Sequence, residues 1–377
     1  MAEITSIERL EKSFRVIWSD NVKSHYNFLW LRDNCSTAKD TNTNHRMFNL
    51  LDLPDHFHPN NYALDQVNKI LTVTWNHEGH QSKYSYEWLR EKCYTLSSNK
   101  KYLSPYELWD QKLEINAIKI EFQEIMDSDE GLKKWLDLLY IKGIAIVKNC
   151  PTEKESAFPL LRRISHTRET FFKTPFDVIS LAKPNTSAYT ALGLRNHTDL
   201  PYFESPPGYQ FLHCLINSAN GGESVASDGY AVAKYMKDNY PNAYKVLTKV
   251  PVKFIDQDYT QNTKRVFHAP EISIDQNGDF KDIRYSIATM AIMDCPPEVM
   301  DEFYDAHQLF GRFLHSNQFC LNFKMGAGDL FSFNNRRVLH GRKAFDMNSG
   351  NRHLQGYYID RDEIESRLNF LNNIDIS

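Results

Sequence analysis

Cysteine is scarce in this sequence, and the few cysteines are scattered. The 377 residues include 6 cysteines, with no CxxC pair and no regular spacing between them. A disulfide framework or a cysteine-only zinc site would need such pairs, so neither is indicated. The simplest expectation is buried or free thiols in a reducing compartment. The sequence also suggests no internal repeat and no low-complexity tract.

Long apolar runs and an excess of positive charge are also missing. No segment reaches the roughly 20 apolar residues that a membrane-spanning helix needs. The first residues, MAEITSIERLEKSF, mix acidic and basic side chains without an apolar core, unlike a secretory signal or a mitochondrial presequence. The formal net charge of -4 disfavours non-specific binding to nucleic acid or to an anionic membrane. We expect a soluble cytoplasmic protein.

Aromatic residues are abundant, at 13% of the chain with 23 Phe, 20 Tyr and 6 Trp. Most of these rings must belong to the core, but some could line a pocket. Hydrophobic residues make up 41% and charged residues 24%, as in ordinary globular proteins. The length suggests two domains or one large domain.

Two regimes divide the chain near the polar, irregular stretch 95–115. We predict a small β-rich domain over 1–100 and a larger domain over 101–377. The first regime contains two segments of alternating hydrophobicity and one short helical segment: 13–19, 69–76 and 85–93.

The second regime mixes helices with many strands. Helical periodicity appears at 153–172, at 296–316 and at 231–249, where Pro241 breaks the pattern. Short strand-like segments separated by turn signals follow one another at 143–149, 209–217, 320–325, 329–334 and 353–360. This pattern predicts a mainly β fold with helices, built as a barrel or sandwich.

A histidine and an aspartate lie two residues apart in LRNHTDLPYF (194–203), as His197 and Asp199. Side chains two apart on an extended chain project to the same face, so both can reach one ion. By itself, the pair also fits a solvated loop. His340 lies just past a predicted strand, and Arg352 lies on the neighbouring strand.

Two histidines and one carboxylate with open positions are the facial triad of non-haem Fe(II) oxygenases. Such an iron needs an electron source, which 2-oxoglutarate commonly supplies. Arg352 is a candidate for the far carboxylate of that co-substrate, because a guanidinium binds a carboxylate through two hydrogen bonds. No Ser-His-Asp or Cys-His arrangement indicates a different chemistry.

Several segments resemble the gamma-butyrobetaine dioxygenase family. In the second regime they are AYTALGLRNHTDLPYFESPPGYQFLHCL (188–215), GGESVASDGYAVA (221–233), GDLFSFNNRRVLHGRKAF (328–345) and NRHLQGYYIDRDEIESRLNFL (351–371). In the first regime they are FLWLRDNC (28–35) and VTWNHEGHQSKYSYEWLREKC (73–93). The resemblance covers nearly the whole chain, and it extends to the sister enzyme trimethyllysine dioxygenase.

The resemblance implies an α+β protein with a double-stranded β-helix catalytic domain behind a small β-rich domain. It implies Fe(II), 2-oxoglutarate and O2, and it leaves ascorbate open as an additional reductant. His197, Asp199 and His340 match the iron ligands of the family, and Arg352 matches its 2-oxoglutarate arginine. Leu212, through its backbone, and Ser224 are further candidates for the co-substrate site.

The resemblance also implies an aromatic cage for a trimethylammonium substrate, since ring faces attract a cation that cannot donate hydrogen bonds. Tyr189 and Tyr358 match cage positions of the family. Phe172 and Phe176 stand where the family usually has Tyr and Trp, which weakens the attraction and leaves the substrate open. A homodimer is implied by the family alone.

The small domain departs from the family, whose zinc is bound by three cysteines and a histidine. Cys35 and His80 match two of these ligands, but Thr37 and Asp40 stand at the other two positions. Two ligands do not make a closed tetrahedral site, even if Asp40 or His45 could substitute. We therefore expect hydrogen bonds and packing in place of zinc.

The predicted function is Fe(II)- and 2-oxoglutarate-dependent hydroxylation of gamma-butyrobetaine to L-carnitine. Two alternatives are hydroxylation of trimethyllysine and of another trimethylammonium compound, such as a phosphonate analogue. A third alternative is a small-molecule-binding β-helix protein without catalysis, which would have no use for a complete triad together with Arg352.

Overall fold

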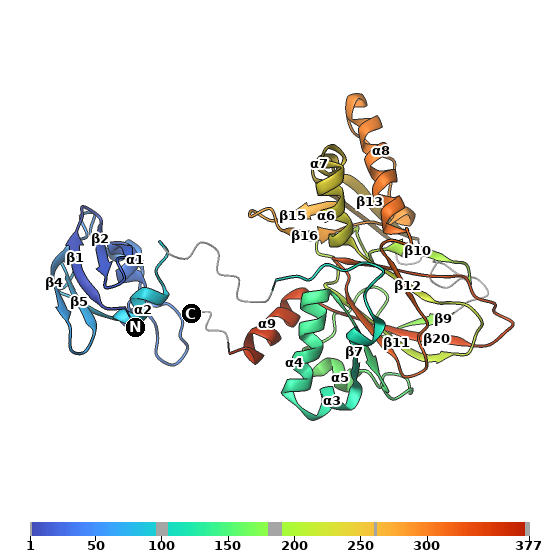
Figure 1. Cartoon of the computed structure of the whole chain (residues 1–377), viewed down its shortest axis with the longest axis horizontal. Helices are drawn as coiled ribbons and strands as arrows, with labels where there is room; N and C mark the ends of the chain where they lie inside the picture. The colour runs from blue at the N-terminus through green and yellow to red at the C-terminus, as the bar shows by residue number, and fades with distance from the viewer. Residues whose placement is uncertain (1, 96–104, 180–190, 260–261, 374–377) are drawn as a thin grey trace. The chain divides into compact units, whose positions relative to one another are not determined.

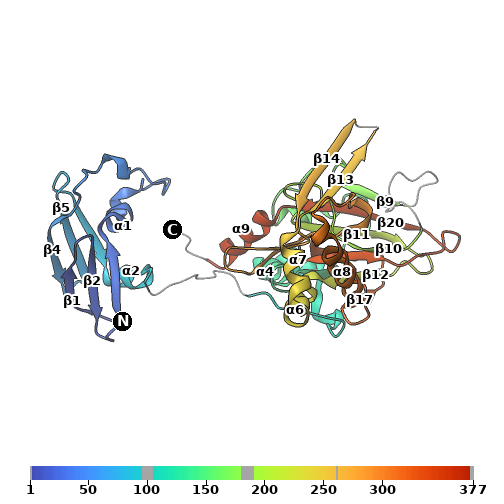
Figure 2. The ribbon, with the colours of Figure 1, turned by 90° about the horizontal axis from the view of Figure 1, so that it is seen from above.

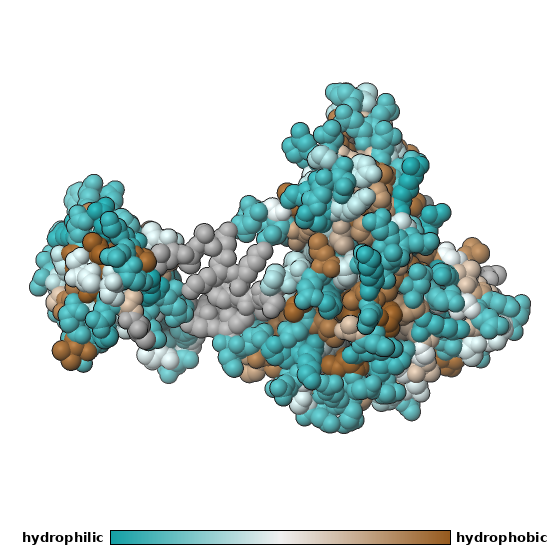
Figure 3. Space-filling view, viewed as in Figure 1, coloured by the Kyte–Doolittle hydropathy of each residue, from teal (hydrophilic) through white to brown (hydrophobic). Residues whose placement is uncertain are grey.

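The computed structural model describes residues 2–95, 105–179, 191–259 and 262–373 (Figure 1). Internal contacts divide the chain into an N-terminal unit, Met1–Lys101, and a C-terminal unit, Tyr102–Ser377. Over the described residues, no helix is long and apolar enough to cross a membrane. Hydrophilic side chains cover most of the face of each unit that Figure 3 shows.

The N-terminal unit is built from two similar halves. Each half is a three-stranded antiparallel sheet followed by a short helix: β1 (Ile4–Arg9), β2 (Ser13–Trp18), β3 (Lys23–Asn27) and α1 (Phe28–Asp33), then β4 (Pro59–Asp65), β5 (Ile70–Trp75), β6 (Gln81–Ser85) and α2 (Tyr86–Glu91). The middle strands β2 and β5 alternate buried and half-buried residues, as their sequence pattern predicts.

The expectation of no internal repeat is wrong. SHYNFLWLRDNC (24–35) and SKYSYEWLREKC (82–93) occupy equivalent places in the two halves. The halves bond reciprocally, because the Tyr26 hydroxyl donates to the Leu89 carbonyl at 2.7 Å and the Tyr84 hydroxyl donates to the Leu31 carbonyl at 2.6 Å. Both buried tyrosines therefore tie one half to the helix of the other.

Two sheets form the framework of the C-terminal unit. The four-stranded sheet has the order β10 (Leu194–His197), β19 (Val338–Arg342), β12 (Ser224–Asp228) and β17 (Cys320–Phe323). The six-stranded sheet has the order β7 (Lys119–Glu121), β8 (Ile144–Lys148), β18 (Leu330–Asn334), β11 (Tyr209–Asn217), β20 (Arg352–Ile359) and β9 (Phe176–Ile179). Buried side chains from both sheets share one core: Cys214, Ala226, Phe331, Phe333 and Leu354.

Helices cover the outside of this framework (Figure 1). Helices α3 (Phe122–Asp127), α4 (Asp129–Asp137), α5 (Phe158–Arg162) and α9 (Arg361–Leu371) share a core with the six-stranded sheet. Helices α6 (Gly229–Asn239), α7 (Pro241–Lys249) and α8 (Pro297–Leu314) pack together with Leu339 of β19. The hairpin β15 (Ile272–Ile274) and β16 (Phe280–Ile283) joins that second core.

The expected helix over 153–172 is wrong for most of its length, since only α5 forms there and turns surround it. Pro159 at the second position of α5 allows a helix start but no continuation from 153. The break between α6 and α7 at Pro241 is confirmed. The long hairpin β13 (Val252–Asp258) and β14 (Thr263–Ala269), which projects from the unit in Figure 2, was not predicted.

Candidate metal centre and active site

The two histidines of the predicted triad face each other across neighbouring strands. Strand β10 pairs antiparallel with β19, and His197 lies directly opposite His340. Their ring centroids are 4.4 Å apart. Asp199 follows two residues after His197, just beyond the end of β10. The pairing of two strands distant in sequence thus brings all three side chains together.

The three ligand atoms meet at one point. Oδ1 of Asp199 lies 3.1 Å from Nε2 of His197 and 3.7 Å from Nε2 of His340. Ligand atoms about 2.1 Å from one ion and at right angles are about 3.0 Å apart, which is close to these separations. Over the described residues, no other group of three His, Cys, Asp or Glu side chains converges in this way. The donor set fits a divalent iron.

A hydrogen bond holds His197 in the tautomer that a metal ligand requires. Its Nδ1 lies 2.9 Å from the carbonyl oxygen of Arg195, which can only accept a hydrogen bond. Nδ1 must therefore carry the proton, so that Nε2 turns its lone pair toward Asp199 and the metal position.

Electrostatics also suit a cation at this point. Burial opposes ionisation of Asp199, but His340, His197 and the Tyr358 hydroxyl together hold its pKa well below the usual range. Burial, reinforced by the charge of His197, lowers the pKa of His340 to about 3. Burial opposes protonation of His197 as well, yet Asp199 raises its pKa. An anionic carboxylate and a neutral His340 are the forms that bind a metal.

The backbone around Asp199 is held from two sides. The side-chain oxygen of Asn335 accepts from the Asp199 N–H at 2.7 Å, and its amide nitrogen donates to the Asp199 carbonyl at 3.0 Å. Three hydrogen bonds join Thr198 to the backbone of Tyr285: the Thr198 N–H and hydroxyl both donate to the Tyr285 carbonyl, and the Tyr285 N–H donates to the Thr198 hydroxyl. Leu200 then takes a left-handed conformation, with a φ of 54°, which a leucine adopts only under constraint.

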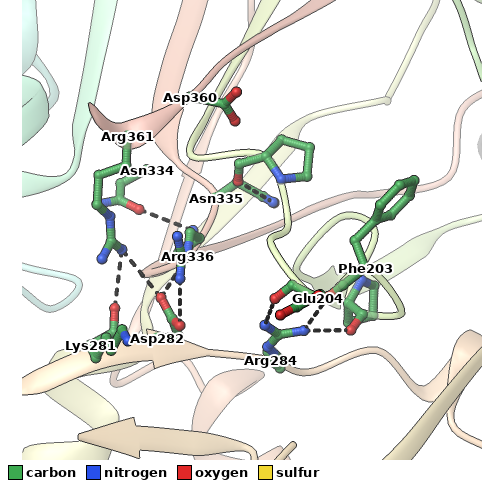
Figure 4. Close-up of polar contacts among 12 residues, drawn as sticks. Phe203, Glu204, Lys281, Asp282, Arg284, Asn334, Asn335, Arg336, Asp360 and Arg361 are labelled. Atoms are coloured by element: carbon green, nitrogen blue, oxygen red, sulfur yellow. Dashed lines mark hydrogen bonds and ion pairs between the residues drawn. The ribbon is translucent and has the colours of Figure 1, made fainter. Parts of the chain in front are cut away.

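A buried arginine holds the loop that follows (Figure 4). Arg284 donates to the carbonyls of Pro201, Phe203 and Glu204 at distances of 2.6 to 2.8 Å. Burial lowers its pKa to about 10, still well above neutrality. A second cluster in the same view joins Arg336 and Arg361 to the carboxylate of Asp282.

A cavity of about 680 Å³ opens beside the triad. This is the size of an ordinary small-molecule site. Its aromatic lining includes Phe172, Phe176, Tyr202 and Tyr358. The Phe172 and Phe176 centroids are 5.9 Å apart, and Phe176 stacks on Tyr358 at 5.2 Å. Three predicted cage residues therefore gather around one space.

The cavity also has a charged lining. Asp256 of β13 forms part of its wall and makes an ion pair of 2.9 Å with Arg265. The Arg265 guanidinium lies 4.1 Å from the centroid of the Phe171 ring. Tyr189, the fourth predicted cage residue, lies outside the described residues.

None of the predicted co-substrate residues Arg352, Leu212 and Ser224 belongs to the described lining of the aromatic cavity. Arg352 begins β20, which follows β19 in the chain but lies in the other sheet. The expectation that Arg352 is on a strand neighbouring that of His340 is therefore wrong. Leu212 lies opposite Gly356 of β20, and Ser224 begins β12.

The surroundings of Arg352 nevertheless favour the binding of an anion. Its guanidinium is largely buried, and no hydrogen bond or ion pair links it to another side chain within the described parts of the chain. Burial lowers its pKa, and Cys214 only partly opposes the effect. A buried cation without an internal counter-charge is costly, which favours a carboxylate ligand.

The predicted zinc position holds a hydrogen-bonded cluster. The Thr37 hydroxyl lies 3.2 Å from Sγ of Cys35 and 3.1 Å from Nε2 of His80. Oδ1 of Asp40 accepts hydrogen bonds from the backbone N–H groups of Asn42 and Thr43. These residues do not fit a closed four-ligand zinc site.

The sequence reasoning missed four residues around the site: Tyr202, Asp256, Arg284 and Asn335. Tyr202 and Asn335 stand in quoted motifs close to His197 and His340, so proximity was a usable signal. Asp256 and Arg284 belong to segments that were not assigned, and no local pattern marks them.

Comparison with known proteins places this geometry in a family. Residues 101–358 match the family described as Taurine catabolism dioxygenase TauD, TfdA family, and residues 5–90 match the one described as Gamma-butyrobetaine hydroxylase-like, N-terminal. The chain is 35% identical to the gamma-butyrobetaine dioxygenase of Pseudomonas sp. (strain AK-1), covering 98% of this chain and 96% of that protein. The chain belongs to the gamma-butyrobetaine dioxygenase family. The family assignment made from the sequence is confirmed.

Other relatives agree with this family assignment. The human gamma-butyrobetaine dioxygenase is 30% identical, covering 95% of this chain and 94% of that protein. The mitochondrial trimethyllysine dioxygenase of Mus musculus is 31% identical, covering 90% of this chain and 81% of that protein. As a member of the gamma-butyrobetaine dioxygenase family, the protein is an Fe(II)- and 2-oxoglutarate-dependent dioxygenase.

A solved structure supports the fold. A Burkholderia xenovorans protein described as an alpha-ketoglutarate-dependent taurine dioxygenase aligns with a TM-score of 0.50 at 13% identity, covering 68% of this chain and 91% of that one. The double-stranded β-helix predicted from the sequence is confirmed.

Proposed function

We propose that this dioxygenase hydroxylates gamma-butyrobetaine to L-carnitine. The observation that carries the proposal is the aromatic group Phe172, Phe176 and Tyr358 in one cavity with the His-Asp-His cluster. Aromatic faces bind a quaternary ammonium well, and a cavity beside the cluster brings the bound molecule to the metal position. The names of the relatives support the same substrate class.

In this proposal His197, Asp199 and His340 hold Fe(II), and Arg352 binds the far carboxylate of 2-oxoglutarate, with the Leu212 backbone and Ser224 nearby. When bound, iron and 2-oxoglutarate supply the oxidising chemistry, in which O2 is consumed and succinate and CO2 are released. The chain orients the substrate and excludes water from the reacting centre. No side chain needs to act as a nucleophile or general base.

The substrate cation would lie against the faces of Phe172, Phe176 and Tyr358, and Tyr189 is proposed as a further cage residue from its match to the family. Phenylalanine has a weaker quadrupole than tryptophan, so these two rings attract the cation less strongly. This leaves room for a second candidate, trimethyllysine, whose dioxygenase in the mouse is 31% identical to this chain. A trimethylammonium phosphonate is a third.

The decisive experiment incubates the protein with Fe(II), 2-oxoglutarate and O2, with and without ascorbate, and with each trimethylammonium compound in turn. We expect substrate-dependent succinate and a hydroxylated product identified by mass spectrometry, with gamma-butyrobetaine turned over fastest. Turnover of none of the compounds would overturn the proposal and favour a binding protein without catalysis.

We further propose that residues 1–100 and 101–377 are separate domains, that the enzyme is a cytoplasmic homodimer, and that the N-terminal domain needs no zinc. The cluster of Thr37 with Cys35 and His80 supports the last point. Light scattering at several protein concentrations tests the dimer, and proteolysis near residue 100 tests the domain boundary.

A further inference from the structure

One tyrosine joins the aromatic cavity to the metal ligand. The Tyr358 hydroxyl lies 2.6 Å from Oδ2 of Asp199 and donates to it, because an ionised carboxylate can only accept. The ring of the same residue stacks on Phe176, with an interplanar angle of 28°. Tyr358 is 2% exposed, so its ring and its hydroxyl are both enclosed by neighbouring residues.

We propose that Tyr358 is a positioning residue that orients the Asp199 carboxylate for the metal and sets the distance from the metal to the bound cation. This inference rests on the proposed iron site and adds a role for the hydroxyl to the proposed role of the ring.

The argument begins with the freedom that Asp199 retains. Its backbone is held by Asn335 on both the N–H and the carbonyl. What remains is rotation of the side chain, which would turn the plane of the carboxylate and carry its oxygens away from the two histidines. The hydrogen bond from Tyr358 to Oδ2 removes that freedom and leaves Oδ1 toward the two Nε2 atoms of His197 and His340.

The second step concerns the substrate. A cation on the faces of Phe176 and Tyr358 lies on a ring whose hydroxyl is tied to a metal ligand. The rigid side chain of Tyr358 therefore reaches from the aromatic cavity to the proposed iron site. Loss of the hydroxyl would free the ring from Asp199, so the C–H presented to the metal would be less well placed.

The neighbouring tyrosine provides a matched comparison. Tyr357 is also buried, and its hydroxyl donates to Oε1 of Gln355 at 3.2 Å. Successive strand residues point to opposite faces, and Tyr357 packs in the core beneath the helices, against Phe158. Loss of that hydroxyl removes a buried hydrogen bond without touching the metal site.

The experiment compares Tyr358→Phe with Tyr357→Phe in the full chain. Each variant is titrated with Fe(II) anaerobically in the presence of 2-oxoglutarate, following the visible charge-transfer band of the complex. Removing a hydrogen bond to a metal ligand costs about 10–100-fold in metal affinity, which is the loss expected for Tyr358→Phe. Tyr357→Phe should bind Fe(II) like the wild type.

A third variant, Phe176→Leu, tests the role of the ring separately from that of the hydroxyl. It also provides a measurement if Tyr358→Phe fails to fold. Phe176→Leu removes the stacking partner but leaves the bond to Asp199. It should raise KM for the trimethylammonium substrate while the dissociation constant for Fe(II) stays unchanged. With saturating Fe(II), Tyr358→Phe should instead release more succinate per hydroxylated product than the wild type.

Unchanged Fe(II) affinity in Tyr358→Phe, or an equal loss in Tyr357→Phe, would overturn the proposed role. A loss of Fe(II) affinity in Phe176→Leu would do the same. The titration contains no substrate, so it does not depend on which compound is hydroxylated. If the wild type itself gave no band, the proposed iron site would fail instead.

Discussion

Asn335 holds Asp199 by both groups of its backbone, accepting from the N–H at 2.7 Å and donating to the carbonyl at 3.0 Å. Its amide nitrogen also donates to the Pro207 carbonyl at 3.1 Å. One buried side chain from the turn between β18 and β19 thus fixes both Asp199 and the loop beyond it.

Asn335→Ala should therefore lower both stability and Fe(II) affinity. Each lost hydrogen bond is worth about 1 kcal/mol, and the buried backbone groups lose their partner, so we expect about 2–4 kcal/mol in urea unfolding. Asn372→Ala is the control, because its amide only donates to the Leu368 carbonyl near the end of α9. Equal effects of both variants would contradict a special role for Asn335.

Alanine at His197, Asp199 or His340 should abolish substrate-dependent succinate formation and leave the fold intact. The reason is that two remaining ligands hold Fe(II) poorly. His353→Gln is the control, since His353 pairs with Asp177 of β9 away from the cluster. Circular dichroism monitors the fold. Near-normal turnover in the triad variants would refute the ligand assignment.

Arg352→Lys should raise KM for 2-oxoglutarate by about 10–100-fold, because a charge-assisted hydrogen bond is worth about 1.5–3 kcal/mol and lysine cannot bind a carboxylate in a fork. KM for the trimethylammonium substrate should change much less. Arg312→Gln on the exposed side of α8 is the control. An unchanged KM for 2-oxoglutarate would place the co-substrate elsewhere.

Stability should fall in mild acid because of His213, which is fully buried in β11. Burial lowers its pKa to about 4, against a weaker opposing contribution from the Pro151 carbonyl. The unfolded state takes up the proton at a higher pH than the folded state. The stabilising contribution of neutral His213 is therefore fully present above about pH 6.5 and is lost as the pH falls from 6.5 toward 4.

The size of this effect is about 3 kcal/mol across that range. Urea unfolding at a series of pH values measures it. His213→Leu should make the profile less steep between pH 6.5 and 4 and leave the contribution of buried His340 in place, whereas His25→Leu on the N-terminal unit should not change the slope. A wild-type profile that is level over this range would show that His213 is not the cause.

Zinc binding should appear in the double variant Thr37→Cys, Asp40→Cys. With Cys35 and His80 it would present three thiolates and one imidazole, the set of a structural zinc site. We expect one bound zinc and a raised Tm in the variant, measured by metal analysis and calorimetry. A chelator should leave the Tm of the wild type unchanged, and a lowered Tm would contradict the hydrogen-bonded cluster.

Much of the fold could be predicted because it depends on local pattern. Strands such as 209–217 and 353–360 are visible as short strand-like segments between turn signals, and the break at Pro241 follows from the missing N–H. The expected helix over 153–172 failed because helical periodicity there was overridden by turns and by Pro159. The repeat of 24–35 in 82–93 is a local similarity, so it could be predicted from the sequence without the structure.

The sequence by itself determined which side chains are available to bind a metal and a carboxylate. They are a histidine and an aspartate two residues apart, a distant histidine after a strand, and an arginine beyond that histidine. Only the tertiary structure decided that His340 faces His197, that Tyr358 bonds to Asp199, and that Arg352 lies in the opposite sheet. The physical reason is that spacing along a strand is set by neighbouring residues. The meeting of distant side chains is set by how the two sheets pair and close.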